Sequence, residues 1–261
     1  MFTDQVVWIT GASSGIGRAL ALEFARRGAH LALSARREDR LREIAAEVEA
    51  LGRRALAVPC DVAHEAEVAR AAGDVVRHFG RMDVAVANAG FAVRGTVEKL
   101  SADDWRRQLD VNVVGLAMTA RHAIPHLRAT GGRVVLVGSV AGMLPAPGAS
   151  AYTASKAAVR AIGQALAVEL RGSGVTCTTI HPGYVESEIS RVDNQGVHRP
   201  EWEDRMPARL KWPADRAARV MVRAVHRRRR EYVFTGHGKL AGFLGRHWPG
   251  LLHFALTRRR S

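Results

Sequence analysis

The chain has 261 residues, 47% of them hydrophobic, so it can form one large α/β domain or two small ones around a sizeable core. No apolar run approaches the ~20 residues that span a bilayer, and the first predicted strand starts within a few residues of Met1, which leaves no room for a signal peptide. The net charge of +14 would suit nucleic acid, but only four of the 39 Lys and Arg residues are lysine, which we interpret as compositional bias.

Short apolar runs alternate with amphipathic stretches along the chain. The apolar runs predict strands at Gln5–Thr10, His30–Ser34, Ala55–Pro59, Asp83–Ala87, Arg133–Gly138, Val175–His181 and Tyr232–Thr235. The amphipathic stretches predict helices at Gly15–Arg27, Glu38–Leu51, Glu65–Phe79, Ala102–Ala129, Ala151–Arg171 and Ala214–Arg227. This alternation predicts an α/β fold with a single domain over residues 1–261, a Rossmann-type doubly wound parallel sheet with helices on both faces.

The first strand leads into a glycine-rich turn, and the first helix follows directly. The turn reads Thr10-Gly11-Ala12-Ser13-Ser14-Gly15-Ile16-Gly17. Glycine permits a tight turn and close approach to a pyrophosphate, and a helix N-terminus offers free N–H groups and a positive dipole. The spacing differs from the commoner G-x-G-x-x-G pattern. By itself the turn indicates either a dinucleotide site or an ordinary connection.

The second strand ends in Ser34-Ala35-Arg36-Arg37, with no acidic residue before Glu38. Sites that bind NAD commonly place Asp or Glu against the ribose 2′-hydroxyl. An arginine suits a 2′-phosphate instead, because its planar guanidinium makes paired, charge-assisted hydrogen bonds. We therefore predict NADP(H) rather than NAD(H). The alternative is that these are two further arginines in an arginine-rich chain.

Polar residues also follow the third and fourth strands. The third ends in Cys60-Asp61-Val62, where Asp61 is placed either to accept a hydrogen bond from an adenine amino group or to cap the next helix. The fourth strand is followed by Asn88-Ala89-Gly90. We expect both segments at the cofactor end of the sheet.

The fifth strand ends at Ser139, and Tyr152 and Lys156 follow on a predicted helix. Their i, i+4 spacing puts Tyr152 and Lys156 on one helix face. Tyrosine ionises near ~10 in isolation, and a nearby ammonium lowers that pKa. The pair can therefore act as an acid/base near neutral pH. The alternative is a tyrosine at the edge of the core beside a solvated lysine.

The segment 184–212 interrupts the alternation of strands and helices. It is long and polar, and it follows the sixth strand at the ligand-binding edge, so we predict a substrate lid. Trp202 and Met206 within it indicate an apolar substrate.

The last quarter of the chain carries most of the positive charge. From Arg199 to Ser261 there are 16 Lys and Arg and 5 Asp and Glu, a net charge of +11. Residues 236–261 add Phe243, Trp248 and Phe254 between basic residues, with Pro249-Gly250 as a helix break. We interpret this basic, amphipathic extension as packing on the lid or a second subunit, or as contacting a membrane surface. Nucleic acid is the least favoured partner of this segment.

Cys60 and Cys177 lie in apolar, strand-like contexts. They predict buried free thiols in a reducing cytoplasm rather than a disulfide framework. The expected location is therefore cytoplasmic, with membrane contact through the basic extension as the alternative to subunit packing.

The order Thr-Gly-x-x-x-Gly-x-Gly, Asn-Ala-Gly, Ser, Tyr-x-x-x-Lys and Pro-Gly resembles the short-chain dehydrogenase/reductase family over about residues 4 to 235. The resemblance implies that Tyr152 exchanges a proton with the carbonyl or alcohol oxygen and that Ser139 hydrogen-bonds this oxygen. Lys156 would bind the nicotinamide ribose and lower the pKa of Tyr152. Asn112 matches the family's relay asparagine. In the middle of a helix it fits a water-holding role or a local hydrogen bond at a kinked turn.

The segment from His181 to Ser187 resembles the family's Pro-Gly segment beside the nicotinamide, with serine where the family often has threonine. It implies that the Val185 backbone and the Ser187 hydroxyl hold the carboxamide. The residues expected at the cofactor are Gly11, Ser13, Ser14, Gly15, Ile16, Gly17, Arg36, Arg37, Asp61, Val62, Asn88, Ala89, Gly90, Tyr152, Lys156, Pro182, Gly183, Val185 and Ser187.

The implied reaction is hydride transfer between NADP(H) and a carbonyl or secondary alcohol. The cofactor supplies the hydride, and the protein supplies geometry and the proton. We favour reduction of a ketone or aldehyde on an apolar or lipid-like substrate, by a homodimer or homotetramer and without a metal ion. The alternatives are a non-catalytic NADP(H) sensor or scaffold and an NAD-dependent alcohol dehydrogenase.

Overall fold

The computed structural model describes the chain except for residues 145, 204–209, 249, 251–253, 255–256 and 259–261. Within the described residues, seven parallel strands form one sheet in the order β3-β2-β1-β4-β5-β6-β7. The strands are β1 Val6–Thr10, β2 His30–Ser34, β3 Ala55–Ala57, β4 Val84–Ala87, β5 Arg133–Val137, β6 Thr176–His181 and β7 Glu231–Val233. The strand order reverses between β1 and β4, and ligands bind at the carboxyl ends of the strands beside such a reversal. The predicted doubly wound parallel sheet is confirmed.

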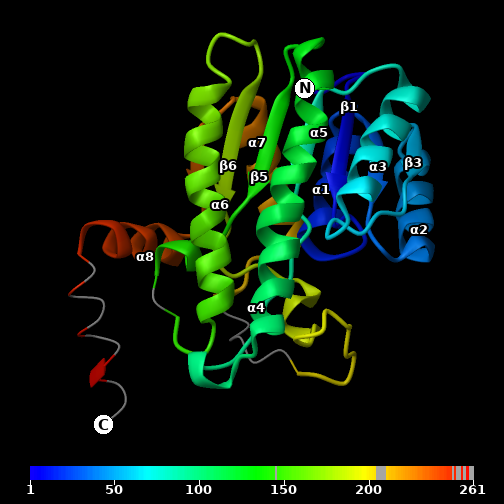
Figure 1. Ribbon diagram of the computed structural model, residues 1–261. Helices are drawn as coiled ribbons and strands as arrows, with labels where there is room; N and C mark the ends of the chain where they lie inside the picture. The colour runs from blue at the N-terminus through cyan, green and yellow to red at the C-terminus, as the bar shows by residue number, and fades with distance from the viewer. Residues whose placement is uncertain (145, 204–209, 249, 251–253, 255–256, 259–261) are drawn as a thin grey trace.

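Helices cover both faces of the sheet (Figure 1). They are α1 Gly15–Arg26, α2 Glu38–Ala50, α3 Glu65–Phe79, α4 Ala102–Leu109, α5 Leu116–Arg128, α6 Ser150–Glu169, α7 Ala214–His226 and α8 Gly236–His247. Buried side chains of α1, α2 and α7 pack on one face, and those of α3, α5 and α6 pack on the other. In the described part of the chain, no helix has both the length and the apolar character needed to span a bilayer.

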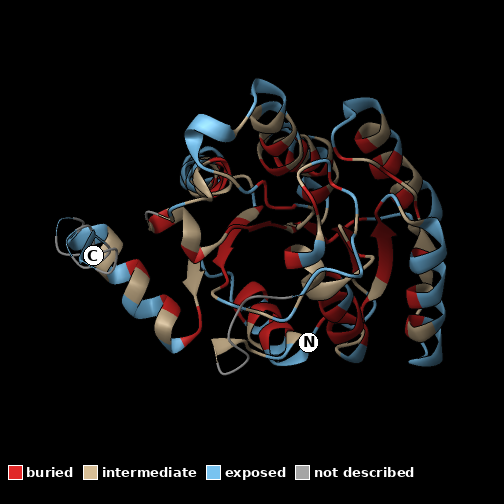
Figure 2. Cartoon of the chain, turned by 90° about the horizontal axis from the view of Figure 1, so that it is seen from below, coloured by how far each residue is buried: buried red, intermediate tan, exposed pale blue. Residues whose placement is uncertain are grey.

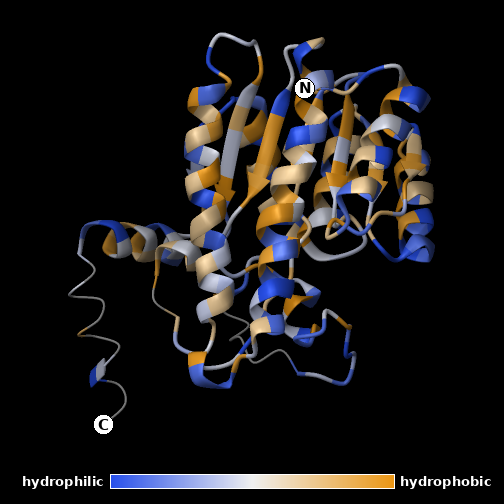
Figure 3. Ribbon diagram, viewed as in Figure 1, coloured by the Kyte–Doolittle hydropathy of each residue, from blue (hydrophilic) through white to orange (hydrophobic). Residues whose placement is uncertain are grey.

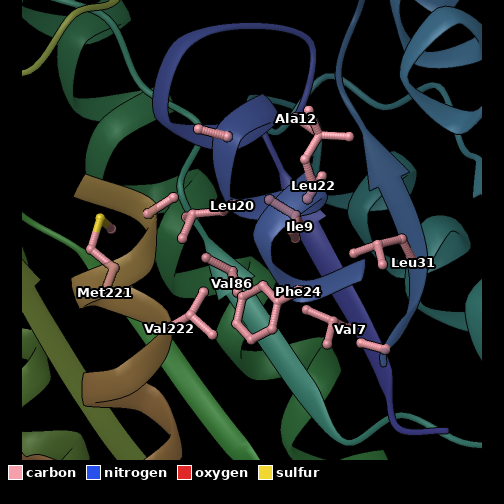
Figure 4. Close-up of a cluster of buried hydrophobic side chains, with 14 of the residues drawn as sticks. Val7, Ile9, Ala12, Leu20, Leu22, Phe24, Leu31, Val86, Met221 and Val222 are labelled. Atoms are coloured by element: carbon pink, nitrogen blue, oxygen red, sulfur yellow. The ribbon is translucent and has the colours of Figure 1, made fainter. Parts of the chain in front are cut away.

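Successive residues of the central strand β1 pack into hydrophobic clusters on opposite faces of the sheet. Val7 and Ile9 of β1 pack with α1 and with Met221 of α7 (Figure 4), whereas Val6 and Trp8 pack on the other face. Successive side chains of a strand point to opposite faces, so a strand covered on both sides must be apolar throughout. Figure 2 shows the buried strands at the centre with exposed residues on the outer sides of the helices. Figure 3 shows β5 as almost entirely hydrophobic and the threonine-rich β6 as paler.

The predicted helix Ala102–Ala129 is wrong as a single α-helix. A π-helical turn, η2 Asp110–Gly115, separates α4 from α5. Gly115 allows the close approach at this point, because a Cβ there would lie 2.6 Å from the Val62 carbonyl oxygen. The interruption matters for function because it contains Asn112.

Short 3-10 turns lie in the connections that follow β4, β5 and β6. Three 3-10 turns occur in the described chain, namely η1 Val97–Lys99, η3 Val140–Met143 and η4 Glu188–Arg191. The last strand ends at Val233 rather than at the predicted Thr235. Thr235 instead caps α8, since its Oγ1 accepts a hydrogen bond from the Gly238 N–H at 3.1 Å.

Candidate active site

The glycine-rich turn joins β1 to α1 with almost no space for side chains. Gly11 and Gly15 have φ angles of +67° and +50°, which other residues adopt only at a cost. A Cβ on Gly17 would lie 2.1 Å from the Gly11 carbonyl oxygen. The N-cap Ser14 makes no side-chain hydrogen bond to the first turn of α1. The first N–H groups of this helix are therefore available to an anion, and the turn fits a cofactor pyrophosphate.

Asn88 connects the end of β4 to this turn. Its Nδ2 donates to the carbonyl oxygens of Thr10 and Gly11 at 3.0 and 3.1 Å, and its backbone N–H donates to Thr10 Oγ1 at 3.2 Å. Asn88 therefore braces the turn in this structure. The predicted cofactor residues Ala89 and Gly90 follow it, and a Cβ on Gly90 would lie 3.6 Å from Lys156 Nζ. The cofactor and chemical ends of the predicted site thus adjoin one another.

The two arginines after β2 point across the sheet edge to the segment after β6. Arg36 donates to the Gly196 carbonyl oxygen at 2.7 Å. Arg37 donates to Ser13 Oγ at 3.2 Å and forms an ion pair with Glu188 at 2.9 Å. The Arg37 guanidinium therefore lies beside the glycine-rich turn, and the Arg36 guanidinium is bound by Gly196 in the segment after β6.

Asp61 lies at the carboxyl end of β3, but it does not cap the next helix. Its Oδ1 accepts the Ala63 N–H at 3.0 Å, and its backbone N–H donates to Glu67 Oε2 at 2.9 Å. Helix α3 begins after His64, which provides no side-chain cap. The helix-capping alternative for Asp61 is therefore wrong. The neighbouring Val62 is buried.

Asn112 is fully buried inside the π-helical turn. Its Oδ1 accepts the Phe91 N–H at 3.1 Å, and its Nδ2 donates to the Phe91 carbonyl oxygen and to Ser155 Oγ, each at 3.0 Å. These bonds connect the loop after β4 to α6, so they are long-range rather than the expected local bond at a kinked turn. The interruption of the helix at this position is the π-helical turn itself.

Ser139, Tyr152 and Lys156 come together at the carboxyl end of β5. Ser139 Oγ accepts the Ala141 N–H at 3.1 Å, and a hydrogen bond from Ser139 stabilises the Tyr152 phenolate. Lys156 lies 5.9 Å from the centre of the Tyr152 ring, and its Nζ donates to the Val137 carbonyl oxygen at 2.9 Å. The predicted groups therefore share one site.

The expected direction of the Tyr152 pKa is wrong. Burial raises the pKa of the phenol, and the opposing effects come from Ser139 and from the charge of Arg94. The buried ammonium of Lys156 is directed at the Val137 carbonyl, and burial lowers its own pKa to about 8. Removing a charged group from water favours its neutral form. Desolvation therefore sets the direction of both pKa shifts.

The Pro182-Gly183 segment lies between the sheet and α8. A Cβ on Gly183 would lie 2.4 Å from Thr235 Oγ1, and the Tyr184 N–H donates to His237 Nε2 at 3.3 Å. The chain then continues through Val185 to Ser187, which faces Gly15 of the glycine-rich turn. The predicted nicotinamide segment therefore runs from the start of α8 to the glycine-rich turn.

Two residues at the site were not identified from the sequence. Arg94 lies in the loop after β4 and exerts its charge on Tyr152, and Glu188 pairs with Arg37. A single Arg or Glu in a loop carries no motif, so no local signal distinguishes either residue. In the predicted lid, Trp202 is 43% exposed, while Met206 lies outside the described residues.

Comparisons with known proteins show which family and which fold the chain resembles. The family described as short chain dehydrogenase matches residues 5–197. The chain is 43% identical over 190 residues to 11-beta-hydroxysteroid dehydrogenase 1A of Arabidopsis thaliana, covering 72% of this chain and 54% of that protein. It is 36% identical to a 3beta-hydroxysteroid dehydrogenase of Mediterraneibacter gnavus, covering 75% and 71%. The chain spans about half the length of the plant relatives that it matches.

Solved structures show the same fold. A short chain dehydrogenase/reductase from Burkholderia phymatum in complex with NAD superposes with a TM-score of 0.81 at 30% identity, covering 89% of each chain. A short chain dehydrogenase from Burkholderia cenocepacia in complex with NADP gives a TM-score of 0.80 at 31% identity, covering 91% and 99%. These neighbours thus include complexes with either dinucleotide.

Proposed function

The chain belongs to the short-chain dehydrogenase family, and from this premise we propose that it transfers hydride between NADP(H) and a ketone or secondary alcohol. The observation that carries the proposal is the convergence of Ser139, Tyr152 and Lys156 at one strand end, beside a turn whose glycines leave room for a pyrophosphate. Asn112 connects the loops around them. This arrangement joins an acid/base group to a dinucleotide site.

The bound nicotinamide would supply the hydride, and the protein residues would manage the proton. Tyr152 would donate its phenolic proton to the carbonyl oxygen, while Ser139 would hydrogen-bond that oxygen. Lys156 would bind the nicotinamide ribose and place its positive charge near the Tyr152 phenol. Asn112 would fix the position of α6 relative to the loop that contains Phe91. Because Tyr152 and Lys156 lie on α6, this contact would help to hold them in place.

We propose reduction as the direction of the reaction. Burial raises the pKa of Tyr152, so the phenol carries its proton at neutral pH and is ready to donate it. Oxidation of an alcohol would need the phenolate instead. The cofactor preference is supported by Arg36 and Arg37, which follow β2 and carry guanidinium groups that suit a 2′-phosphate. Arg37 lies beside the turn.

We propose an apolar substrate of the hydroxysteroid type. The relatives reported above include 11-beta- and 3beta-hydroxysteroid dehydrogenases, and Trp202 of the segment 184–212 offers an exposed aromatic surface. This segment would act as the substrate lid.

We also propose that the outer face of α8 contacts an anionic membrane surface. Leu240 and Phe243 are 62% and 54% exposed there, and Trp248 follows them. The sequence from Tyr232 to Ser261 contains five Lys and Arg and no Asp or Glu, which complements anionic lipid. A second copy of this chain carries the same net charge of +14, so lipid is the better partner for this face. A homodimer or homotetramer would form through other surfaces of a cytoplasmic protein.

The replacement Tyr152→Phe tests the activity. Removing the hydroxyl removes the proton donor, so we expect the rate on a panel of ketones and aldehydes with NADPH to fall by roughly 10²-fold or more. Tyr232→Phe on β7 is the matched control and should retain activity. The assay follows nicotinamide absorbance with both cofactors.

The same panel separates the alternatives. Nucleotide binding without turnover of any carbonyl or alcohol would favour the sensor or scaffold. A strong preference for NADH would favour the NAD-dependent alcohol dehydrogenase and contradict the assignment of Arg36 and Arg37.

A further inference from the structure

The carboxylate of Glu188 lies at the glycine-rich turn, although 151 residues separate it from Arg37. Its Oε2 pairs with the Arg37 guanidinium at 2.9 Å, and a hydrogen bond from Ser14 also stabilises the carboxylate. Arg37 in turn donates to Ser13 Oγ at 3.2 Å. An anion belonging to the protein is therefore bound at the entrance of the proposed phosphate site.

These donors are the ones that the proposed function assigns to the cofactor. Carboxylate and phosphate oxygens accept the same charge-assisted hydrogen bonds from a guanidinium. Arg37 cannot give its full charge to a 2′-phosphate while Glu188 neutralises it.

The segment that follows Glu188 also binds Arg36. Arg36 donates to the Gly196 carbonyl oxygen at 2.7 Å, and a Cβ on Gly15 would lie 2.9 Å from Ser187 Cβ. Ser187 and Glu188 thus lie against the turn, and Glu188 and Gly196 bind the two arginines expected at the 2′-phosphate. A nucleotide that uses these arginines must exchange contacts with this segment.

We propose that Glu188 is an internal competitor for the cofactor 2′-phosphate and thereby sets how strongly the enzyme prefers NADP(H) to NAD(H). The inference rests on the proposed use of NADP(H). Burial acts to raise the pKa of Glu188, but hydrogen bonding and charge from Arg37 leave it below the usual value. The carboxylate is therefore ionised at neutral pH, and the competition operates there.

Calorimetry on the full-length protein tests the proposal with two nucleotides, 2′,5′-ADP and 5′-AMP, which differ only in the 2′-phosphate. Glu188→Gln removes the competing charge, so 2′,5′-ADP should bind about fivefold more tightly, as for a partly exposed ion pair worth about 1 kcal/mol. The affinity for 5′-AMP should change less. Glu186→Gln, the same change at an exposed position on the same segment, is the matched control and should bind both nucleotides as the wild type does.

A double-mutant cycle with Arg37→Ala identifies the route of the effect. Without the guanidinium, Glu188→Gln should give no gain for 2′,5′-ADP, and in the wild-type background the gain should shrink as salt is added. An equal gain for both nucleotides, or a gain that persists in Arg37→Ala, would overturn the inference while leaving the proposed cofactor in place. Failure of every variant to bind either nucleotide would overturn the proposed function together with it.

Discussion

At the residue scale, burial decides the protonation of the two groups that would carry the chemistry. It raises the pKa of Tyr152 and lowers the pKa of Lys156 to about 8. Both shifts favour the neutral form, as expected when a charge leaves water. A protonated phenol beside a lysine that is still charged at neutral pH suits donation of a proton to a carbonyl.

These directions predict an alkaline limit for reduction. Below about pH 8 Lys156 is an ammonium and Tyr152 a phenol, so kcat/KM for a ketone should be level there. Above about pH 8 the lysine loses its proton, and kcat/KM should fall with a slope approaching tenfold per pH unit. A pH profile with NADPH measures this limit.

Lys156→Arg provides the control, because a guanidinium stays charged across this range. Its activity is expected to be lower, but the fall in kcat/KM at alkaline pH should begin more than one pH unit higher than in the wild type. If kcat/KM of Lys156→Arg falls at the same pH as in the wild type, a group other than Lys156 causes the fall.

At the element scale, the first turn of α1 depends on the absence of a side chain at Gly17. A Cβ there would lie 2.1 Å from the Gly11 carbonyl oxygen, and neither backbone segment can move without disturbing β1 or α1. Gly17→Ala should therefore lower the free energy of unfolding by about 1–3 kcal/mol and abolish detectable NADPH binding. Urea unfolding and nucleotide titration measure the two effects.

Gly73→Ala in α3 is the matched control for Gly17→Ala. It lies inside a helix, with only the end of the Arg77 side chain at 4.0 Å. Alanine should stabilise this helix by about 0.5–1 kcal/mol and leave nucleotide binding intact. Similar stability losses in the two variants would argue against a specific close approach at Gly17.

Helix α8 packs its glycines against the turn that follows Ser139. A Cβ on Gly245 would lie 1.8 Å from the Met143 carbonyl oxygen, and one on Gly242 would lie 3.1 Å from the Met143 sulfur. An ion pair between Arg246 and Glu231 fastens the same helix to β7. The C-terminal helix is thus placed to hold the Ser139 turn in position.

Gly245→Ala should displace this contact and reduce kcat by roughly tenfold or more, because small displacements of reacting groups are costly. Gly236→Ala in the same helix should be near neutral, since no atom lies within 4 Å of the added Cβ. Steady-state kinetics at saturating NADPH gives the comparison. Equal kcat values for the two variants would mean that α8 does not position the turn.

At the scale of the whole molecule, positive charge and exposed aromatic residues coincide in one region. Figure 1 shows α8 beside the body of the sheet. Phe243, Trp248 and Phe254 are 54%, 57% and 51% exposed. Exposed apolar side chains among cations are the basis of the proposed contact with lipid.

Flotation with vesicles measures this contact. The wild type should bind phosphatidylcholine vesicles that contain phosphatidylserine, and added salt should weaken the binding. The double variant Leu240→Ala and Phe243→Ala should lose most of it, whereas Val168→Ala, which removes a 72% exposed apolar side chain from α6, should not. Equal recovery of all three would remove the membrane proposal, and sedimentation would then show whether α8 joins two subunits.

The sequence alone identified the doubly wound sheet, the glycine-rich turn and the pair of Tyr152 and Lys156. These features depend on local patterns, namely continuous apolar strands, glycines at fixed spacing and an i, i+4 pair on one helix. The resemblance to the family added Ser139 to the pair. The π-helical turn around Asn112 was missed because the Phe91 and Ser155 partners that satisfy the asparagine lie far along the chain.

Only the tertiary structure decided the electrostatics of the site. It brought Glu188 to Arg37 and Arg94 to Tyr152, and it buried Lys156 deeply enough to lower its pKa. It also turned the glycine face of α8 toward Met143. Charge interactions and desolvation depend on distances between residues remote in sequence and on the exclusion of water, and neither quantity exists until the chain is folded.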